Sequence, residues 1–176
     1  MCGIIGYLGK EASKNVIEGL EKLEYRGYDS AGIAIKINND IKIFKDKGRV
    51  NHLKELLNGD TNTDLAIGHT RWATHGEASQ INAHPHTSYS GRYIIVHNGV
   101  IENYKSIKYS YLKDINFVSK TDTEVIVDLI DYFSKTYNTI DSIRKTMTLI
   151  EGSYAVLLID KYDLNKIYFF KNYKII

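Results

Sequence analysis

The sequence is poor in the residues that define several protein classes. It contains one cysteine, one proline and one tryptophan in 176 residues. A single cysteine excludes an internal disulfide framework and a zinc site built from several cysteines. No apolar run approaches the roughly 18 residues that a membrane span requires, and the N-terminus has no basic segment followed by an apolar one. We therefore expect no signal peptide, no membrane association and a cytoplasmic setting.

The sequence also lacks an excess of charge of one sign. It has 23 Lys and Arg against 21 Asp and Glu, a formal net charge of +2. This balance indicates neither a nucleic-acid-binding surface nor a basic membrane anchor. Hydrophobic residues at 43% and charged residues at 25% are typical of a globular protein that can bury a core. The length predicts one domain, residues 1–176.

Hydrophobic periodicity predicts strands and helices that occur in clusters rather than in strict alternation. Short apolar runs predict strands at residues 3–8, 31–37, 41–44, 65–68, 94–96, 115–118, 154–159 and 166–170. Apolar residues at three- and four-residue spacing predict helices at 11–23, 50–57, 103–112, 122–133 and 140–150. Thr121, followed three residues later by Glu124, is a helix-start signature. The clustering favours an α+β layered sandwich over a doubly wound sheet.

Cys2 is the first candidate for chemistry. Removal of Met1 leaves a cysteine that carries its own α-amino group. This amine, with a reference pKa of about 7.7 to 8.0, can act as the base for a thiol whose reference pKa is about 8.5. The alternative is a disordered chain end, but the apolar run 3–8 predicts that the terminus is tied into a sheet.

Asn98 and Gly99 follow the predicted strand 94–96 and allow two interpretations. A side-chain amide beside a glycine N–H provides two donors on one short arc, as an oxyanion hole requires. Taken alone, however, an Asn-Gly pair is more often the turn of a hairpin.

Arg71 and Asp122 are candidates for binding an amino acid. Arg71 at a strand end can clamp a carboxylate, and Asp122 at a helix start can pair with an ammonium group, so together they suit a zwitterion. The alternatives are a surface arginine stacked on Trp72 and an aspartate that satisfies a helix N-terminus.

Residues 69–92 have no periodicity and contain four of the six histidines. Long aperiodic segments inside compact domains are more often functional than idle. His84-Pro85-His86 has no recognised metal-ligand spacing, so we expect loop-shaping histidines, no metal and no cofactor.

Taken together, six blocks of sequence closely resemble the glutaminase domain of the glutamine-fructose-6-phosphate aminotransferase family. This domain is a class II glutamine amidotransferase domain. The blocks are MCGIIG at 1–6, LEYRGYDSAG at 23–32, GHTRWATHG at 68–76, NAHPH at 82–86, HNGVIENY at 97–104 and KTDTEVI at 120–126. The resemblance covers essentially the whole chain. It implies an N-terminal-nucleophile hydrolase fold, a four-layer αββα sandwich in which two antiparallel sheets stack between helices.

The resemblance also implies a role for each candidate residue. It identifies Cys2 as the nucleophile that forms a thioester with the side chain of L-glutamine and releases ammonia, and Asn98 and Gly99 as the oxyanion hole. Arg71 matches the residue that binds the substrate carboxylate, and Asp122 the residue that binds its ammonium group. Trp72, Thr74 and His75 match a loop that closes over glutamine, and Arg26 a position near the nucleophile.

The sequence departs from the family at its end, since family members continue into further strands and two sugar-isomerase domains. We therefore expect an unpaired sheet edge and the glutaminase half-reaction only, with fructose 6-phosphate bound by isomerase domains outside this chain. Assembly with a second copy or with an isomerase partner is open. The alternative function is a non-catalytic fragment that acts only by associating with such a partner. A histidine metal site is a third hypothesis, which stoichiometric metal in the purified protein would support.

Overall fold

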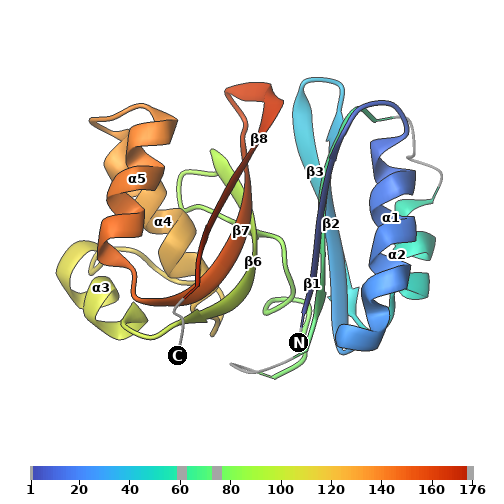
Figure 1. Cartoon of the computed structure of the whole chain (residues 1–176), viewed down its shortest axis with the longest axis horizontal. Helices are drawn as coiled ribbons and strands as arrows, with labels where there is room; N and C mark the ends of the chain where they lie inside the picture. The colour runs from blue at the N-terminus through green and yellow to red at the C-terminus, as the bar shows by residue number, and fades with distance from the viewer. Residues whose placement is uncertain (1, 59–62, 73–76, 174–176) are drawn as a thin grey trace.

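The computed structural model describes residues 2–58, 63–72 and 77–173. These residues form two four-stranded antiparallel sheets, with strand orders β1-β4-β2-β3 and β5-β6-β7-β8. Figure 1 shows the sheets stacked face to face, with α1 and α2 outside the first sheet and α3, α4 and α5 outside the second. The predicted four-layer αββα sandwich is confirmed.

The elements follow the predicted order closely. The strands are β1 (Gly3–Leu8), β2 (Ser30–Ile37), β3 (Asp40–Lys47), β4 (Leu65–Arg71), β5 (His86–Thr87), β6 (Tyr93–Ile101), β7 (Gly152–Asp160) and β8 (Asp163–Asn172). The helices are α1 (Ala12–Leu23), α2 (Val50–Leu57), α3 (Tyr104–Tyr111), α4 (Thr123–Ser134) and α5 (Thr139–Leu149), with a short 3-10 turn at Glu24–Arg26. None of these helices is long and apolar enough to cross a membrane.

The apolar face predicted for α1 is buried against the first sheet. Ala12, Val16 and Leu20, spaced four residues apart, are fully buried and belong to one core cluster with residues of β2 and α2. A second cluster fills the space between the sheets, and a third lies between the second sheet and the helices α4 and α5. The four layers are thus held together by three apolar interfaces.

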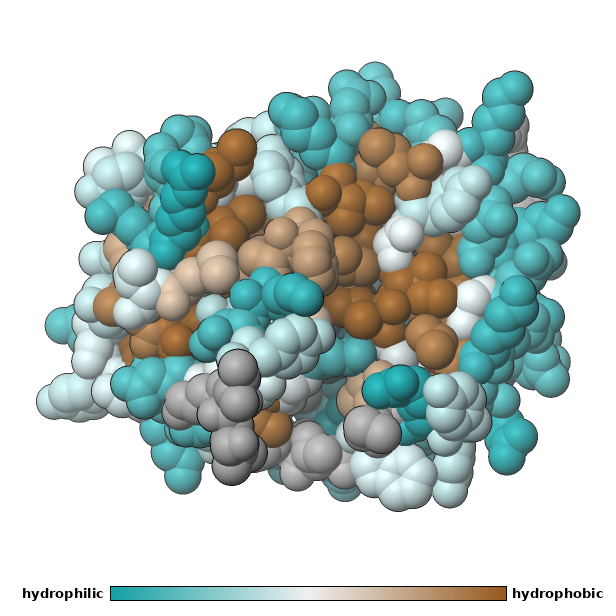
Figure 2. Space-filling view, viewed as in Figure 1, coloured by the Kyte–Doolittle hydropathy of each residue, from teal (hydrophilic) through white to brown (hydrophobic). Residues whose placement is uncertain are grey.

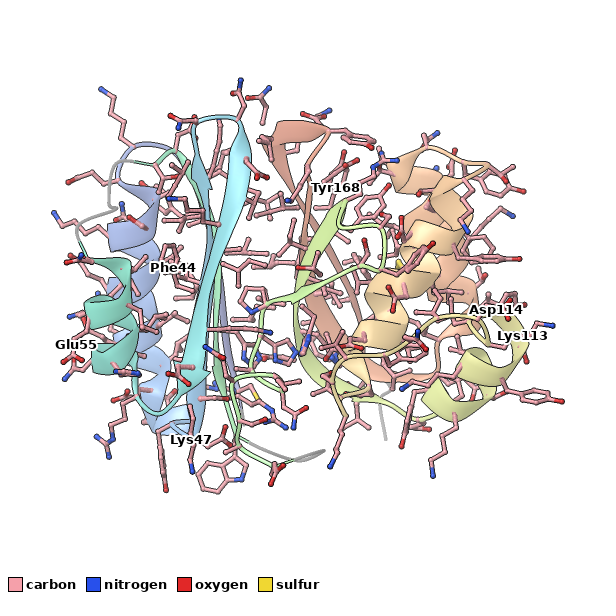
Figure 3. All side chains as sticks on the ribbon, turned by 180° about the vertical axis from the view of Figure 1, so that it is seen from behind. Phe44, Lys47, Glu55, Lys113, Asp114 and Tyr168 are labelled. Atoms are coloured by element: carbon pink, nitrogen blue, oxygen red, sulfur yellow. The ribbon has the colours of Figure 1, made fainter. Side chains whose placement is uncertain are left out.

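Strands β2 and β6 are apolar on both faces because each sheet is covered on both sides. In β2, Ile33 and Ile35 pack toward the helices and Ala34 packs toward the other sheet. Figure 3 labels Phe44 on β3 and Tyr168 on β8, which pack against the two outer clusters beside the helices. Alternate strand residues point to opposite faces, so a strand between two layers reads as a continuous apolar run.

Strands β1 and β8 lie at the edges of their sheets and contact each other. Figure 2 shows apolar side chains gathered in the middle of this face, over β1 and its boundary with β8. Leu8 and Phe169, one from each edge strand, are 54% and 60% exposed. This face of the molecule is therefore largely apolar at its centre.

The strand predicted at residues 115–118 is wrong, because this segment forms a loop. Ile115 and Phe117 do pack against the core, which explains their apolar pattern. The backbone N–H groups of Val118 and Ser119, however, donate to the Glu124 carboxylate at 2.9 and 2.7 Å. A side chain, and not a neighbouring strand, satisfies this part of the backbone.

The same contacts correct the predicted start of the helix 122–133. Helix α4 begins at Thr123 with Asp122 in the N-cap position, and Glu124 uses its carboxylate on the preceding loop instead of closing a capping box with Thr121. The other four helices lie within one or two residues of their predicted bounds.

Most of the predicted strands are longer in the structure than in the prediction, and two of the extensions bear on the candidate site. Strand β4 continues from the predicted end at Gly68 to Arg71, and β6 continues beyond Val96 to Ile101. Asn98 and Gly99 therefore lie inside a strand, paired with Ala155 and Tyr154 of β7. The hairpin-turn interpretation of this pair is wrong.

Candidate active site

Cys2 is held at the start of β1, where the two sheets meet. The N–H of Gly3 donates to Thr70 Oγ1 at 3.2 Å, and Asn98 Nδ2 donates to the Cys2 carbonyl oxygen at 3.0 Å. The N–H of Trp72 donates to Cys2 Sγ at 3.3 Å. Contacts from β4, β6 and the residue after β4 thus fix the position of the thiol, as the apolar run after Cys2 predicted.

Gly99 is required by its backbone conformation and by its neighbours. Its φ is +135°, and a Cβ added there would lie 2.1 Å from the carbonyl oxygen of Ser153. Only glycine combines this conformation with such a close approach of β7. Gly99 follows Asn98, whose side-chain amide contacts the Cys2 backbone. Asn98 and Gly99 line the same cleft as Cys2.

The cleft beside Cys2 has a volume of about 520 Å³. Its walls come from the ends of both sheets, and they include Leu23, Arg26, Val100, Tyr154 and Tyr173 as well as the residues already described. Arg26 ends the 3-10 turn that follows α1. Trp72 is 47% exposed at the rim and packs edge-on against Tyr28, with ring centroids 5.4 Å apart.

A smaller cavity of about 30 Å³ adjoins this cleft. Cys2, Trp72 and Gly99 line both spaces, and the smaller one adds Arg71, His84, His97, Thr121, Asp122 and Thr123. The structure therefore brings the predicted nucleophile, one oxyanion-hole residue and both predicted zwitterion-binding residues to one place.

Arg71 and Asp122 give this cavity two opposite charges, and each is positioned by its element. Arg71 is the last residue of β4, is 4% exposed and donates from Nη1 to the Glu77 carbonyl oxygen at 3.3 Å. Asp122 is 6% exposed and accepts the N–H of Ile101 at 2.7 Å. Buried charges that face a shared cavity can bind an ammonium and a carboxylate group of one ligand.

Two predicted site residues, Thr74 and His75, lie outside the described residues. The remaining predicted residues are all present at the cleft or the adjoining cavity.

Four histidines form a buried group next to the cavity. The rings of His69 and His84 stack with centroids 4.1 Å apart, and His86 meets His84 edge-on at 4.7 Å. Burial lowers the pKa of His69 to about 3 and that of His97 to about 4, and it lowers the pKa values of His84 and His86 well below 6.5. These rings are therefore neutral near pH 7. Among the described residues, no group of three or more His, Cys, Asp or Glu side chains is arranged to hold a metal ion.

A larger cavity, of about 550 Å³, lies away from Cys2 and is lined by none of the predicted site residues. Two charged side chains line it, and both contact backbone. The Lys45 ammonium donates to the carbonyl oxygens of Ala83 and Pro85 at 2.7 and 2.9 Å, and the Glu124 carboxylate accepts the N–H groups of Val118 and Ser119. Lys45 thus holds the 83–85 segment in place, and we assign the chemistry to the smaller cleft at Cys2.

Sequence reasoning missed Thr70 and Thr123. Thr70 anchors the residue after Cys2, and Thr123 contacts two of the buried histidines. No local pattern reveals either role, because the pairing of residue 3 with residue 70 and of residue 123 with residues 84 and 97 is non-local. Only a prediction of how β1 pairs with β4 could have suggested the contact between Gly3 and Thr70.

Comparison with known proteins gives the family. Residues 58–167 match the model of a glutamine amidotransferase domain. This chain belongs to the glutamine amidotransferase domain family. Its fold is the N-terminal-nucleophile fold of the structurally similar amidotransferases described below.

The most similar curated amidotransferases include two bacterial glutamine-fructose-6-phosphate aminotransferases (isomerizing). The protein of Geobacillus kaustophilus is 53% identical over 174 residues, which cover 98% of this chain and 29% of that protein. The protein of Staphylococcus epidermidis is 54% identical over 175 residues, again 98% of this chain and 29% of that protein. The chain thus spans less than a third of the length of these relatives.

Solved amidotransferase structures share the fold. Glutamine phosphoribosylpyrophosphate amidotransferase from B. subtilis, complexed with ADP and GMP, is 27% identical, with a TM-score of 0.77 over 92% of this chain and 35% of that chain. A glutamine aminotransferase class-II domain protein from Silicibacter pomeroyi has a TM-score of 0.61 over 92% of this chain and 73% of that chain, and at 13% identity it supports the fold alone.

Proposed function

We propose that this amidotransferase domain hydrolyses the side-chain amide of L-glutamine through a thioester on Cys2. One observation carries the proposal: the Cys2 thiol lies between a cleft that contains Asn98 and Gly99 and a cavity that contains Arg71 and Asp122. The arrangement supplies a nucleophile, donors for an oxyanion and two charges for an amino-acid head group.

The reaction begins when the α-amine of Cys2, freed by removal of Met1, takes the proton of the thiol. The sulfur attacks the amide carbon, and the carbonyl oxygen gains a negative charge that Asn98 Nδ2 and the Gly99 N–H stabilise. The carbon–nitrogen bond then breaks, and the leaving nitrogen takes the proton from the α-ammonium group and departs as ammonia.

The second half of the reaction releases glutamate. The α-amine removes a proton from a water molecule, whose oxygen attacks the thioester carbon. The carbon–sulfur bond breaks, and the thiolate regains a proton. No metal or organic cofactor takes part in these steps.

Substrate selection is assigned to the residues around the smaller cavity. Arg71 binds the α-carboxylate and Asp122 the α-ammonium group of glutamine. We assign Trp72, Thr74 and His75 to substrate binding as well, and Arg26 lines the wall of the cleft near the nucleophile.

The fate of the ammonia is proposed from the names of the relatives. These are glutamine-fructose-6-phosphate aminotransferases, and this chain spans 29% of their length. We therefore assign to this chain the glutaminase half-reaction of glucosamine 6-phosphate synthesis. Isomerase domains outside residues 1–176 would bind fructose 6-phosphate and receive the ammonia.

The test is an assay of ammonia and glutamate release from L-glutamine by wild type and by the Cys2→Ala variant. The wild type is expected to release both products in equal amounts, and Cys2→Ala to lose activity by about a thousandfold or more. Mass spectrometry of the wild type is expected to find Cys2 as the first residue. Undiminished activity in Cys2→Ala would remove the nucleophile assignment. A wild type that lacks Met1, binds glutamine and releases nothing would support a non-catalytic fragment instead.

A further inference from the structure

The two charged residues of the small cavity belong to different layers of the molecule. Arg71 ends β4 in the first sheet, and Asp122 is the N-cap of α4, which lies outside the second sheet (Figure 1). A ligand that binds both charges needs them at a fixed separation, because a displacement of about 1 Å in a binding group can cost much of its interaction. A contact that joins the two segments would set this separation.

The Asn82 side chain makes such a contact. It is 3% exposed and lies between β4 and β5. Its Nδ2 donates at 3.0 Å to the Glu77 carbonyl oxygen, which also accepts Arg71 Nη1 at 3.3 Å. Its Oδ1 accepts the N–H of Lys120, two residues before Asp122, at 3.0 Å. One buried amide thus links the carbonyl group that holds Arg71 to the segment that leads into Asp122.

The chemistry of the two partners fixes the orientation of this amide. A backbone carbonyl group only accepts hydrogen bonds and a backbone N–H only donates, so Nδ2 must face Glu77 and Oδ1 must face Lys120. Leucine has a similar shape but can make neither contact, and an ionised aspartate, which only accepts, can make only the contact with Lys120. The bridge therefore needs both a donor and an acceptor, which the asparagine amide provides.

Among the described residues that line the cleft and the small cavity, Asn82 does not occur, which places its amide behind the site. We propose that Asn82 is a positioning residue that sets the separation of the Arg71 and Asp122 charges for a zwitterionic amino acid. The inference rests on the proposed function, because it explains how that same site selects its substrate.

This role predicts a selective effect on binding. A ligand with both an ammonium and a carboxylate head group binds Arg71 and Asp122 at once, so its affinity depends on their separation. A ligand with only one of these head groups binds one residue and can follow it when it shifts. Loss of the Asn82 amide should therefore weaken the binding of zwitterions more than that of ligands that lack one head group.

The test variant is Asn82→Leu, and the chain offers a matched control in Asn103→Leu. Asn103 makes the same two kinds of hydrogen bond elsewhere: Nδ2 donates to the Leu149 carbonyl oxygen at 2.8 Å, and Oδ1 accepts the N–H of Glu151 at 2.9 Å. These contacts join the segment after β6 to the connection between α5 and β7. Both variants lose a bridging amide, but only Asn82→Leu loses the bridge between the two charged residues.

Binding is measured by calorimetry on the intact chain with L-glutamate, with glutarate, which lacks the ammonium group, and with 4-aminobutanoate, which lacks the α-carboxylate. Asn82→Leu is expected to weaken L-glutamate binding about five- to thirtyfold and that of the other two ligands less than about twofold. Asn103→Leu should bind all three as the wild type does. Equal weakening of the three ligands, unchanged L-glutamate binding in Asn82→Leu, or the same loss in Asn103→Leu would overturn the proposal.

Alkylation by iodoacetamide shows whether the rest of the site is intact. Cys2 is the one cysteine of the sequence, so the reaction reports on it alone. Without ligand, the alkylation rate should be the same in the wild type and in both variants. A rate that changes more than about fivefold in Asn82→Leu would show a general disruption and would overturn a role confined to the head group.

Neither measurement uses catalysis, so the outcome is separable from that of the glutaminase assay. Failure of the thioester assignment there would leave the binding comparison intact. A wild type that binds L-glutamate and an Asn82→Leu variant that binds it equally well would overturn the role of Asn82 alone. A wild type that binds no L-glutamate would remove the head-group assignment itself, and this proposal with it.

Discussion

At the scale of single residues, the site is built where local sequence rules conflict with the fold. Asn98 and Gly99 have the composition of a turn, yet they lie within β6 and pair with β7. Position 99 requires glycine for two reasons: its φ is positive, and β7 approaches its Cα too closely for a side chain. Residue chemistry proposed these two residues as oxyanion donors, but no pattern in the sequence placed them in a strand.

Gly99→Ala is expected to lower the free energy of unfolding by about 3 kcal/mol or more, because the added Cβ meets the Ser153 carbonyl oxygen at 2.1 Å in a backbone conformation that alanine avoids. Urea denaturation measures the effect. Gly91→Ala is the control: its φ is +80° and nothing lies within 4 Å of the added Cβ, so about 1 kcal/mol is expected. Equal losses in the two variants would contradict this account of Gly99.

At the scale of elements, apolar periodicity predicted the helices well and failed at residues 115–118. In the helices, apolar residues recur at three- and four-residue spacing, a pattern that fits a helix and does not fit a strand. A short apolar run has no such signature, and here Ile115 and Phe117 are partly buried in a loop that belongs to neither sheet. The contact that settles this loop, from Glu124, belongs to the next element along the chain.

The joint between β6, β7 and α5 depends on Asp160. This carboxylate is 2% exposed, accepts Arg92 Nε and Nη2 at 2.9 and 2.7 Å and accepts the Thr139 hydroxyl at 2.7 Å. Asp160→Asn is expected to lower the free energy of unfolding by about 2 to 3 kcal/mol, because an amide places its own donor against these donors.

The control for this joint is Asp163→Asn. This change breaks an ion pair with Lys166 at the surface, and both residues of that pair lie on β8. Exposed pairs contribute little, so the denaturation midpoint should stay where it is in the wild type. A loss in Asp163→Asn as large as that in Asp160→Asn would show that the burial of the Asp160 pair is not what matters.

At the scale of the whole molecule, the stacking of two sheets buries polar groups that the sequence shows only as an aperiodic segment. His69, His84 and His86 come from β4, a loop and β5, and His97 comes from β6 of the opposite sheet from β4. The aperiodic segment 69–92, which contains the first three of these histidines, was predicted to be functional. The sequence did not predict a stacked group of neutral rings, because that group exists only once the sheets have met.

Acid is therefore expected to destabilise the fold. The four histidines have pKa values in the folded state below the ordinary value of 6.5, so the unfolded chain binds more protons as pH falls. The contribution of these histidines to stability is fully present above about pH 6.5 and is lost as pH falls toward the pKa values of the folded state, about 4 for His97 and about 3 for His69. Asp128, whose pKa burial raises to about 7, acts in the opposite direction but is one group against four.

Urea denaturation at pH 7, 5.5 and 4.5 tests this expectation. The free energy of unfolding should fall by about 1.4 kcal/mol per pH unit for each net proton. His52→Gln is the control, because hydrogen bonds to Asp46 and Glu55 raise the pKa of this exposed ring and its contribution is instead lost as pH rises. In this variant, the free energy of unfolding should fall between pH 7 and 4.5 at least as much as it does in the wild type. Stability that is constant from pH 7 to 4.5 would contradict the neutral histidine group.

The central claim is that Cys2 carries the substrate as a thioester, and the most direct measurement is intact-protein mass spectrometry after mixing with L-glutamine and rapid quenching in acid. We expect the wild type to gain the mass of one glutamyl group, located on Cys2 by peptide mapping. Asn98→Ala should accumulate it about a hundredfold more slowly, because it loses an oxyanion donor. Glutamine turnover without any adduct on Cys2, or an adduct on another residue, would contradict the account.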